Sequence, residues 1–261
     1  MVRTLLIRGM LAGVVAGLLA FGFSKLFGEP PIERAIAFET QMDEAKSHDS
    51  MDMSKGMDMP KEAEAEPEPE LVSRGAQASI GLFTGVMIYC TAFGGLFALV
   101  FAFAYGRAAD LRPRSFAALL AAAGFVAVYL VPALKYPANP PSVGLPETIG
   151  YRTALFCVMI AASLAAMVFA GILRRHLVAR YGEWSAAIIA AVAYLGSIVV
   201  IQLLLPSINE VPEQFPAVVL WQFRIAALGT QFVMWMTIGL LFGALAEGAL
   251  GGGKRSHLQA A

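Results

Sequence analysis

Hydrophobic residues gather into six long runs along the chain, and shorter polar segments separate them. The runs cover residues 4–27, 79–105, 115–134, 150–173, 184–205 and 221–246. Each run is close to or above the about 20 residues with which a helix crosses a hydrocarbon core, and the middle of each lacks charged side chains. The pattern predicts an all-α membrane protein, a bundle of about six transmembrane helices.

The composition supports this prediction and narrows the choice of partners. Hydrophobic residues make up 58% of the chain and charged residues 15%, whereas soluble domains are about 45–50% apolar. The mean hydropathy is +0.67. The formal net charge is zero, and no basic domain offers an electrostatic footprint for nucleic acid. We therefore expect membrane lipid, and no nucleic acid, as a partner.

The first run resembles a secretory signal, because Arg3 and Arg8 lie beside its apolar residues. Its apolar stretch is longer than the roughly 7–15 residues of a signal core, so residues 1–27 are predicted to remain as the first transmembrane helix. Gly9, Gly13 and Gly17 recur at every fourth position. This spacing places residues without side chains on one helix face, and it predicts close approach of a neighbouring helix.

The basic residues predict how the chain is oriented. They lie at the N-terminus, in alternate short loops and at the C-terminus: Arg3, Arg8, Arg107, Arg112, Arg114, Arg174, Arg175, Arg180, Lys254 and Arg255. By the positive-inside rule, both termini are expected in the cytoplasm. Residues 28–78 then form an outer loop, residues 79–246 a region of five helices and residues 247–261 a cytoplasmic tail. The outer loops carry carboxylates, so an approaching cation would meet a negative surface first.

The outer loop at residues 28–78 is predicted to be largely disordered, because its KEAEAEPEPE stretch (residues 61–70) is rich in Glu and Pro. Just before that stretch, thioethers, carboxylates and one imidazole lie close together. Thioethers suit Cu(I), whereas carboxylate oxygens and imidazole nitrogens suit harder divalent ions. The tract is a candidate metal collector, and a low-complexity linker is the open alternative. Its candidate ligands are His48, Asp49, Met51, Asp52, Met53, Met57, Asp58 and Met59.

Two further outer loops, residues 131–153 and 205–224, are rich in proline. Proline fixes φ and pushes the preceding residue toward extended backbone, so both loops are predicted to be stiff. Each loop delivers an arginine, Arg152 or Arg224, to the start of the next apolar run. Such an arginine either snorkels to the membrane surface or pairs with a loop carboxylate to shape an outer vestibule.

The vestibule candidates are the carboxylates, amides and arginines of the three outer loops. They are Glu33, Glu39, Asn139, Glu147, Arg152, Asn209, Glu210, Glu213 and Arg224. Arg74 stands at the corresponding place before the second apolar run. The chain therefore has the pattern of three successive helical hairpins, each with an acidic outer loop that ends on an arginine.

The outer loops also resemble a known family. The resemblance rests on LKYPANPP at residues 134–141, TIGYRT at 148–153, NEVP at 209–212, FPA at 215–217 and LWQFR at 220–224, together with PIE at 31–33 and FE at 38–39. These motifs are similar to those of the CbtA family of predicted cobalt transporter subunits. They span nearly the whole chain.

The resemblance implies a multi-pass protein of the bacterial inner membrane that takes up Co(II) for cobalamin synthesis. It also implies a small single-span partner, CbtB, and no resident cofactor. Members of the family often carry a histidine-rich stretch after the first helix, and this chain has one histidine there among Met and Asp. Because thioethers lean toward copper and imidazole suits nickel as well as cobalt, nickel and copper are the alternative metals.

The sequence contains no nucleotide-binding loop of the G-x-x-x-x-G-K-[ST] form and no carboxylate in the middle of an apolar run. His48, His176 and His257 all lie outside the apolar runs, so we expect no enzyme. A membrane enzyme and an anchoring subunit remain the alternatives from other classes. The polar and soft side chains inside the runs are expected mostly to serve helix packing. They are Gln202, Gln231, Thr230, Ser163, Tyr129 and Tyr194, with Met87, Met159, Met167, Met234 and Met236.

Overall fold

The computed structural model describes residues 2–53, 73–107 and 111–259, and within these ranges the chain forms helices and no strand. The main helices are α1 (Val2–Phe23), α2 (Glu29–Met53), α3 (Arg74–Ala76), α4 (Leu82–Ala104), α5 (Pro113–Gly124), α6 (Val131–Lys135), α7 (Ile149–Leu204) and α8 (Ala217–Gln259). Short π-helical turns at Ser24–Gly28, Gln77–Gly81 and Phe125–Leu130 join neighbouring helices into longer rods. The predicted all-α fold class is confirmed.

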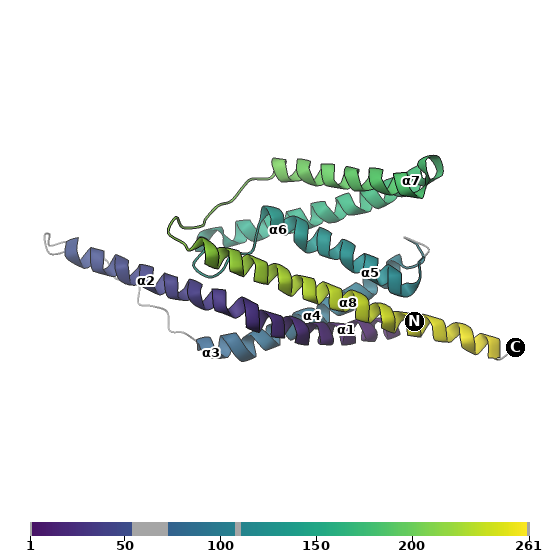
Figure 1. Ribbon diagram of the computed structural model, residues 1–261, viewed down its shortest axis with the longest axis horizontal. Coiled ribbons are helices and arrows are strands. Elements are labelled where there is room, and N and C mark those ends of the chain that lie inside the picture. The colour runs from purple at the N-terminus through teal and green to yellow at the C-terminus, as the bar shows by residue number, and fades with distance from the viewer. Residues whose placement is uncertain (1, 54–72, 108–110, 260–261) are drawn as a thin grey trace.

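Five of these helical rods are long and apolar enough to cross a membrane. They are Val2–Ala45, Arg74–Ala104, Pro113–Lys135, Pro146–Leu204 and Ala217–Leu250. The fourth rod contains α7, which reverses direction at Gly182, where φ is 77° and ψ is 168°. A positive φ is open to glycine at little cost, so this one residue divides α7 into two arms. The arms correspond to the fourth and fifth apolar runs, and Figure 1 shows them as a hairpin.

Alternate helix ends lie on opposite sides of the molecule. Figure 1 shows the N-terminus, the C-terminal part of α8 and the turn at Gly182 at one end, and α2 with the loops before α7 and α8 at the other. The segments that carry Arg107, Arg112 and Arg174 lie at the end of the termini, as the positive-inside pattern requires. Which end faces the cytoplasm remains a prediction from these arginines.

The core of the bundle lies where α1 and α8 pack with α4 and α5. The three glycines of α1 face α4, and a Cβ atom on Gly9 or Gly13 would fall closer to backbone atoms of Gly94 or Cys90 than the 3.0 Å that real Cβ atoms keep. The predicted close helix approach is therefore confirmed. Aromatic rings then fill the space between α4, α5 and α8, with Phe97, Phe101, Phe116, Trp235 and Phe242 all buried. A second apolar cluster joins α7 to α6.

The segment after the first apolar run differs from the predicted loop. We expected residues 28–78 to be a largely disordered loop, but residues 29–53 are helical, because α1 continues through the π-helical turn into α2, which ends at Met53. The KEAEAEPEPE stretch on which the prediction rested lies outside the described residues. The wider turn accommodates Pro30 and Pro31, whose missing N–H groups would otherwise break the helix. The residues that follow include Glu, Ala, Gln and Lys, which favour helix. The segment expected as a cytoplasmic tail, residues 247–261, continues α8 as far as Gln259, and its place in the cytoplasm stays a prediction.

Candidate functional site between two proline-rich loops

The loop that precedes α7 and the loop that precedes α8 are held side by side. The first follows the end of α6 at Lys135, and the second follows the end of α7 at Leu204. The Lys135 ammonium donates to Ser207 Oγ at 3.1 Å, and the Tyr136 hydroxyl donates to the carbonyl oxygen of Pro206 at 2.9 Å. These cross-links between loops about 70 residues apart in sequence fix the site's entrance.

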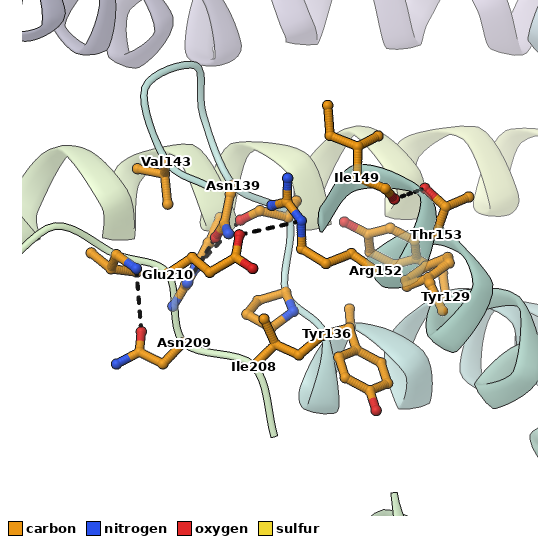
Figure 2. A pocket seen from close by; sticks show the side chains of 16 residues that line it. Tyr129, Tyr136, Asn139, Val143, Ile149, Arg152, Thr153, Ile208, Asn209 and Glu210 are labelled. Carbon is orange, nitrogen blue, oxygen red and sulfur yellow. Dashed lines mark hydrogen bonds and ion pairs between the residues drawn. The ribbon is translucent and has the colours of Figure 1, made fainter. Parts of the chain in front are cut away.

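An ion pair joins the two loops at the N-terminal end of α7. Arg152 Nε lies 3.5 Å from Glu210 Oε2, and Figure 2 shows the two side chains pointing toward each other. The same Glu210 oxygen accepts hydrogen bonds from the backbone N–H of Leu145 and from the Thr148 hydroxyl, both at 2.9 Å. One carboxylate oxygen of the second loop therefore anchors three groups of the first loop and its helix.

A second contact runs in the opposite direction between the same two loops. Arg224, in the second turn of α8, donates from Nη2 to Asn139 Oδ1 at 2.9 Å and from Nε to the Ala138 carbonyl at 3.3 Å. Thus the arginine after the first loop holds the second loop, and the arginine after the second loop holds the first. We call the two contacts, Arg152–Glu210 and Arg224–Asn139, the reciprocal latch.

The latch corrects part of the predicted pairing. Arg152 pairs with Glu210 as one of the two sequence hypotheses proposed, but Arg224 binds an amide and a carbonyl rather than a carboxylate. Glu147 and Glu213 are exposed, and neither forms an ion pair within the described part of the chain. Arg74 pairs inside its own hairpin, with the buried carboxylate of Glu29 at 2.6 Å.

Helix α2 covers one side of the latched loops. Ala35 and Phe38 of α2 pack against Val143 and Phe215, one from each loop. Close by, the Ser142 hydroxyl lies 3.0 Å from the Ala35 carbonyl and 2.9 Å from Glu39 Oε2. Of the acidic candidates on α2, Glu39 therefore contacts the first loop, whereas Glu33 is exposed. The rigid helix in place of the predicted loop thus helps to build the site.

The latched loops, the ends of α7 and α8 and the region of α6 line a half-open cavity of about 470 Å³. A metal ion with six water molecules would occupy roughly 180 Å³ at about 30 Å³ per water, so the cavity is large enough for a hydrated ion or a small complex. Figure 2 shows its polar lining. The polar side chains in that lining are Tyr129, Tyr136, Asn139, Arg152, Thr153, Asn209, Glu210 and Arg224.

The surroundings of Glu210 keep its carboxylate charged. Hydrogen bonds from the Leu145 N–H and the Thr148 hydroxyl, and the nearby Arg152 guanidinium, lower the pKa of Glu210 below its usual range. A lowered pKa means that these contacts are complete above the ordinary carboxyl pKa and are lost only when the pH falls through the lowered value. The latch is therefore expected to be intact at any pH near neutrality.

Replacing Gly144 by alanine is expected to disturb the latch at its centre. Gly144 has a φ of 114°, which disfavours other residues, and a Cβ atom there would fall inside van der Waals contact with the Arg152 guanidinium. Arg152 must then move away from Glu210. For the cobalt uptake that the family resemblance implies, we expect at least a severalfold lower rate at unchanged abundance in the membrane. Gly150→Ala is the matched control, because nothing lies within 4 Å of its added Cβ; equal losses in both variants would contradict the prediction.

Several of the sequence candidates lie away from this cavity. The backbone of His48, Asp49, Met51, Asp52 and Met53 belongs to the far end of α2, while Met57, Asp58 and Met59 lie outside the described residues. The metal-collector hypothesis therefore stays a prediction. Within the described residues, no three His, Cys, Asp or Glu side chains gather as a metal cage.

Three of the six polar side chains inside the apolar runs join helices, as expected, whereas Tyr129 lines the main cavity. The hydroxyls of Ser163 and Tyr194 are 3.0 Å apart between the two arms of α7, and Gln202 Nε2 lies 3.4 Å from the Val131 carbonyl. Thr230 and Gln231 behave differently, because they line a smaller cavity of about 220 Å³ between α1, α4 and α8. Met234 and Cys90 line it as well.

Sequence reasoning missed three residues of the first loop and its helix that support the latch or fix the loop on α2. Thr148, Ser142 and Gly144 supply two hydroxyl donors and a gap for a guanidinium. Thr148 lies inside the TIGYRT motif, which was a usable signal. Gly144 follows Ser142 in a proline-rich loop, where a glycine marks a tight turn.

Comparison with known proteins agrees with the architecture and with the loop motifs. A family model described as "Probable cobalt transporter subunit (CbtA)" matches residues 2–247, nearly the whole chain. No curated protein and no solved structure matches the chain. The family match includes the apolar helices, α2 and both latched loops, and on this ground the chain belongs to the CbtA family of probable cobalt transporter subunits.

Proposed function

We propose that this protein is an inner-membrane subunit that takes up cobalt for cobalamin synthesis and acts with a small single-span partner. The observation that carries the proposal is the latched cavity, which lies at one end of a bundle of apolar helices in a chain of a cobalt transporter family. Concave sites between the helices of a bundle are common places for a small ligand to bind, and a cavity at one end of the bundle can receive cargo from that side of the membrane.

The reciprocal latch is the gate in this proposal. Arg152 and Glu210 join α7 to the loop before α8, and Arg224 and Asn139 join α8 to the loop before α7. Opening one contact frees the end of a transmembrane helix, so movement of a loop is coupled to movement of a helix. Ion-pair and hydrogen-bond exchange is a common device for such two-state elements.

The exposed carboxylates are proposed to act outside the gate. Glu33, Glu147 and Glu213 remain exposed around the latched loops, where they raise the local concentration of cations. The Met/Asp tract at the end of α2 would collect metal further out. Because no carboxylate lies in the middle of an apolar run, we place the driving force with a partner rather than with this chain.

The proposal is tested by metal accumulation in cells with and without this chain, at limiting external metal. Cobalt, nickel and copper are measured together by elemental mass spectrometry, with the small partner supplied in parallel. We expect a selective rise in cobalt that needs the chain. A rise in copper alone would move the function to the Met/Asp tract, and no change in any metal with the partner present would refute the proposal.

A further inference from the structure

The charges that line the cavity do not suit a bare divalent cation. Its lining includes two guanidinium groups, those of Arg152 and Arg224, and a single carboxylate, that of Glu210. The other lining residues are neutral at pH 7. The net charge of the lining is therefore positive, and a free Co²⁺ ion would be repelled by it.

One oxygen of the single carboxylate is also occupied. Glu210 Oε2 already accepts hydrogen bonds from Leu145 and Thr148 and lies 3.5 Å from Arg152 Nε. To bind a metal ion through this oxygen, Glu210 would have to give up all three partners. The cavity in this state therefore offers a cation only the other oxygen of this carboxylate, beside two guanidinium groups.

The two arginines, by contrast, have donors to spare. Arg152 Nε is buried and makes no hydrogen bond with any described residue, although it lies within ion-pair range of Glu210. Arg224 donates only to neutral oxygens, those of Asn139 and Ala138. Guanidinium groups bind carboxylates in paired hydrogen bonds, and their charge is best balanced by an oxyanion. Both observations point to an anionic ligand.

We infer that the cavity takes its cargo as a metal ion complexed with a small polycarboxylate, and that free carboxylate oxygens of the complex bind Arg152 and Arg224. The inference rests on the proposed function and names the chemical form of its substrate. Citrate illustrates the class, since this tricarboxylate more than neutralises a divalent ion. A cavity of about 470 Å³ has room for such a complex.

The anionic complex must pass the exposed carboxylates before it reaches the cavity. The carboxylates lie in solvent, whereas the arginines line the cavity. Glu147 and Glu213 are exposed to solvent, where salt screens their charge beyond about 8–10 Å. Arg152 is three-quarters buried, so its charge acts on a ligand inside the cavity with much less screening. The two partly buried arginines therefore decide whether an anionic or a cationic species is retained in the cavity.

The experiment uses the full chain in nanodiscs of zwitterionic lipid. Three titrations are compared by calorimetry: cobalt chloride, cobalt with equimolar citrate, and citrate alone. Retained metal is measured in parallel by elemental analysis. We expect cobalt citrate to bind about tenfold or more tightly than cobalt chloride, which is the effect of one charge-assisted contact. Binding of the complex should weaken as salt increases.

Variants of Arg224 test whether its charge binds the complex. Arg224→Gln keeps a donor for Asn139 but removes the charge, and it should weaken cobalt citrate binding about tenfold. Arg224→Lys, which keeps the charge without the planar fork, should lie between. Arg34→Gln is the matched control, since Arg34 is exposed on α2 and contacts Gln222 away from the cavity. Should Arg224→Gln fail to fold, the three titrations of the unchanged protein and their salt dependence still show whether the cavity prefers the complex to the free ion.

Cobalt chloride that binds as tightly as the complex, together with removal of the metal by citrate, would overturn the inference. That result would leave cobalt uptake by the chain intact, whereas absent cellular accumulation would refute the proposed function itself. Loss of cobalt citrate binding when phosphatidylglycerol is added to the nanodiscs would assign the arginines to a lipid headgroup phosphate and would also overturn it.

Discussion

Replacing Gly13 by leucine is expected to abolish the folded protein, and replacing it by alanine should lower its stability by about 3 kcal/mol, at the upper end of typical overpacking costs. Gly13 faces α4 in the close contact between the two helices. An added Cβ would fall closer than 3.0 Å to the carbonyl oxygen of Cys90 and to Thr91 Cα. Both obstacles are backbone atoms, so no side-chain rotation relieves the overlap.

The loss of stability is large because an overlap at Gly13 also disturbs the neighbouring contacts between α1 and α4. Gly9 lies one turn away and meets the backbone of Gly94 equally closely, and Gly17 meets Met87. Separating α1 from α4 at Gly13 therefore also opens the contacts at both neighbours. Helices in lipid associate mainly through such packing, because lipid tails are as apolar as the helix surface. A total stability of about 5–15 kcal/mol leaves little reserve.

Gly22 provides the matched control on the same helix. Nothing lies within 4 Å of a Cβ built on it, so Gly22→Ala should be neutral or slightly stabilising. The measurement is the monodisperse fraction after detergent extraction and its thermal midpoint, by fluorescence-detected size exclusion. If Gly13→Ala and Gly22→Ala behaved alike, the close α1–α4 contact would be refuted.

The glycine spacing and the apolar runs were readable from sequence because each depends on a local pattern. A helix face is set by the 3.6-residue period, so Gly9, Gly13 and Gly17 predict a close contact without identifying its partner. The partner residue Cys90 could not be predicted, since it depends on how α1 and α4 slide against each other. The same limit applies to Arg224, whose partner Asn139 lies 85 residues away.

Helix α2 shows a different limit of sequence reasoning. The prediction of a loop rested on the acidic stretch at residues 61–70, which lies outside the described residues, whereas the π-helical turn at Ser24–Gly28 carries the helix past Pro30 and Pro31. A π-helical turn has no reliable sequence signature. Contacts of Ala35 and Phe38 with the two loops then stabilise α2 from outside its own sequence. Packing against the two loops, which the sequence of α2 alone does not reveal, therefore helps to keep this segment helical.

Replacing Glu210 by alanine is expected to lower the initial rate of cobalt uptake about tenfold, the scale on which charge-assisted hydrogen bonds act. The substitution removes the acceptor shared by Leu145, Thr148 and Arg152, so the loop before α7 loses three anchors at once. Uptake is measured with the partner present and normalised to the amount of protein in the membrane.

Two further variants should lose less cobalt uptake than Glu210→Ala does. Glu210→Gln keeps an amide oxygen that can accept from the Leu145 N–H and the Thr148 hydroxyl and loses only the ion pair. Within the loops, Arg152→Ala removes the ion pair and a 3.4 Å hydrogen bond to the Leu145 carbonyl, and it leaves Glu210 with its two hydrogen-bond donors. Each should therefore cost less than Glu210→Ala. A loss in Arg152→Ala that equals the loss in Glu210→Ala would mean that the ion pair alone closes the gate.

Glu213→Ala separates the latch from the general effect of negative charge at the loops. Glu213 lies three residues from Glu210, is exposed, and forms no ion pair with any described residue. Removing it lowers the negative surface charge as much as removing Glu210 does, but it leaves the latch intact. Near-normal uptake in Glu213→Ala would show that the position of a carboxylate matters more than the charge of the surface. Equal losses in both variants would instead make the loops a cation-attracting surface, and the reciprocal latch would then have no part in transport.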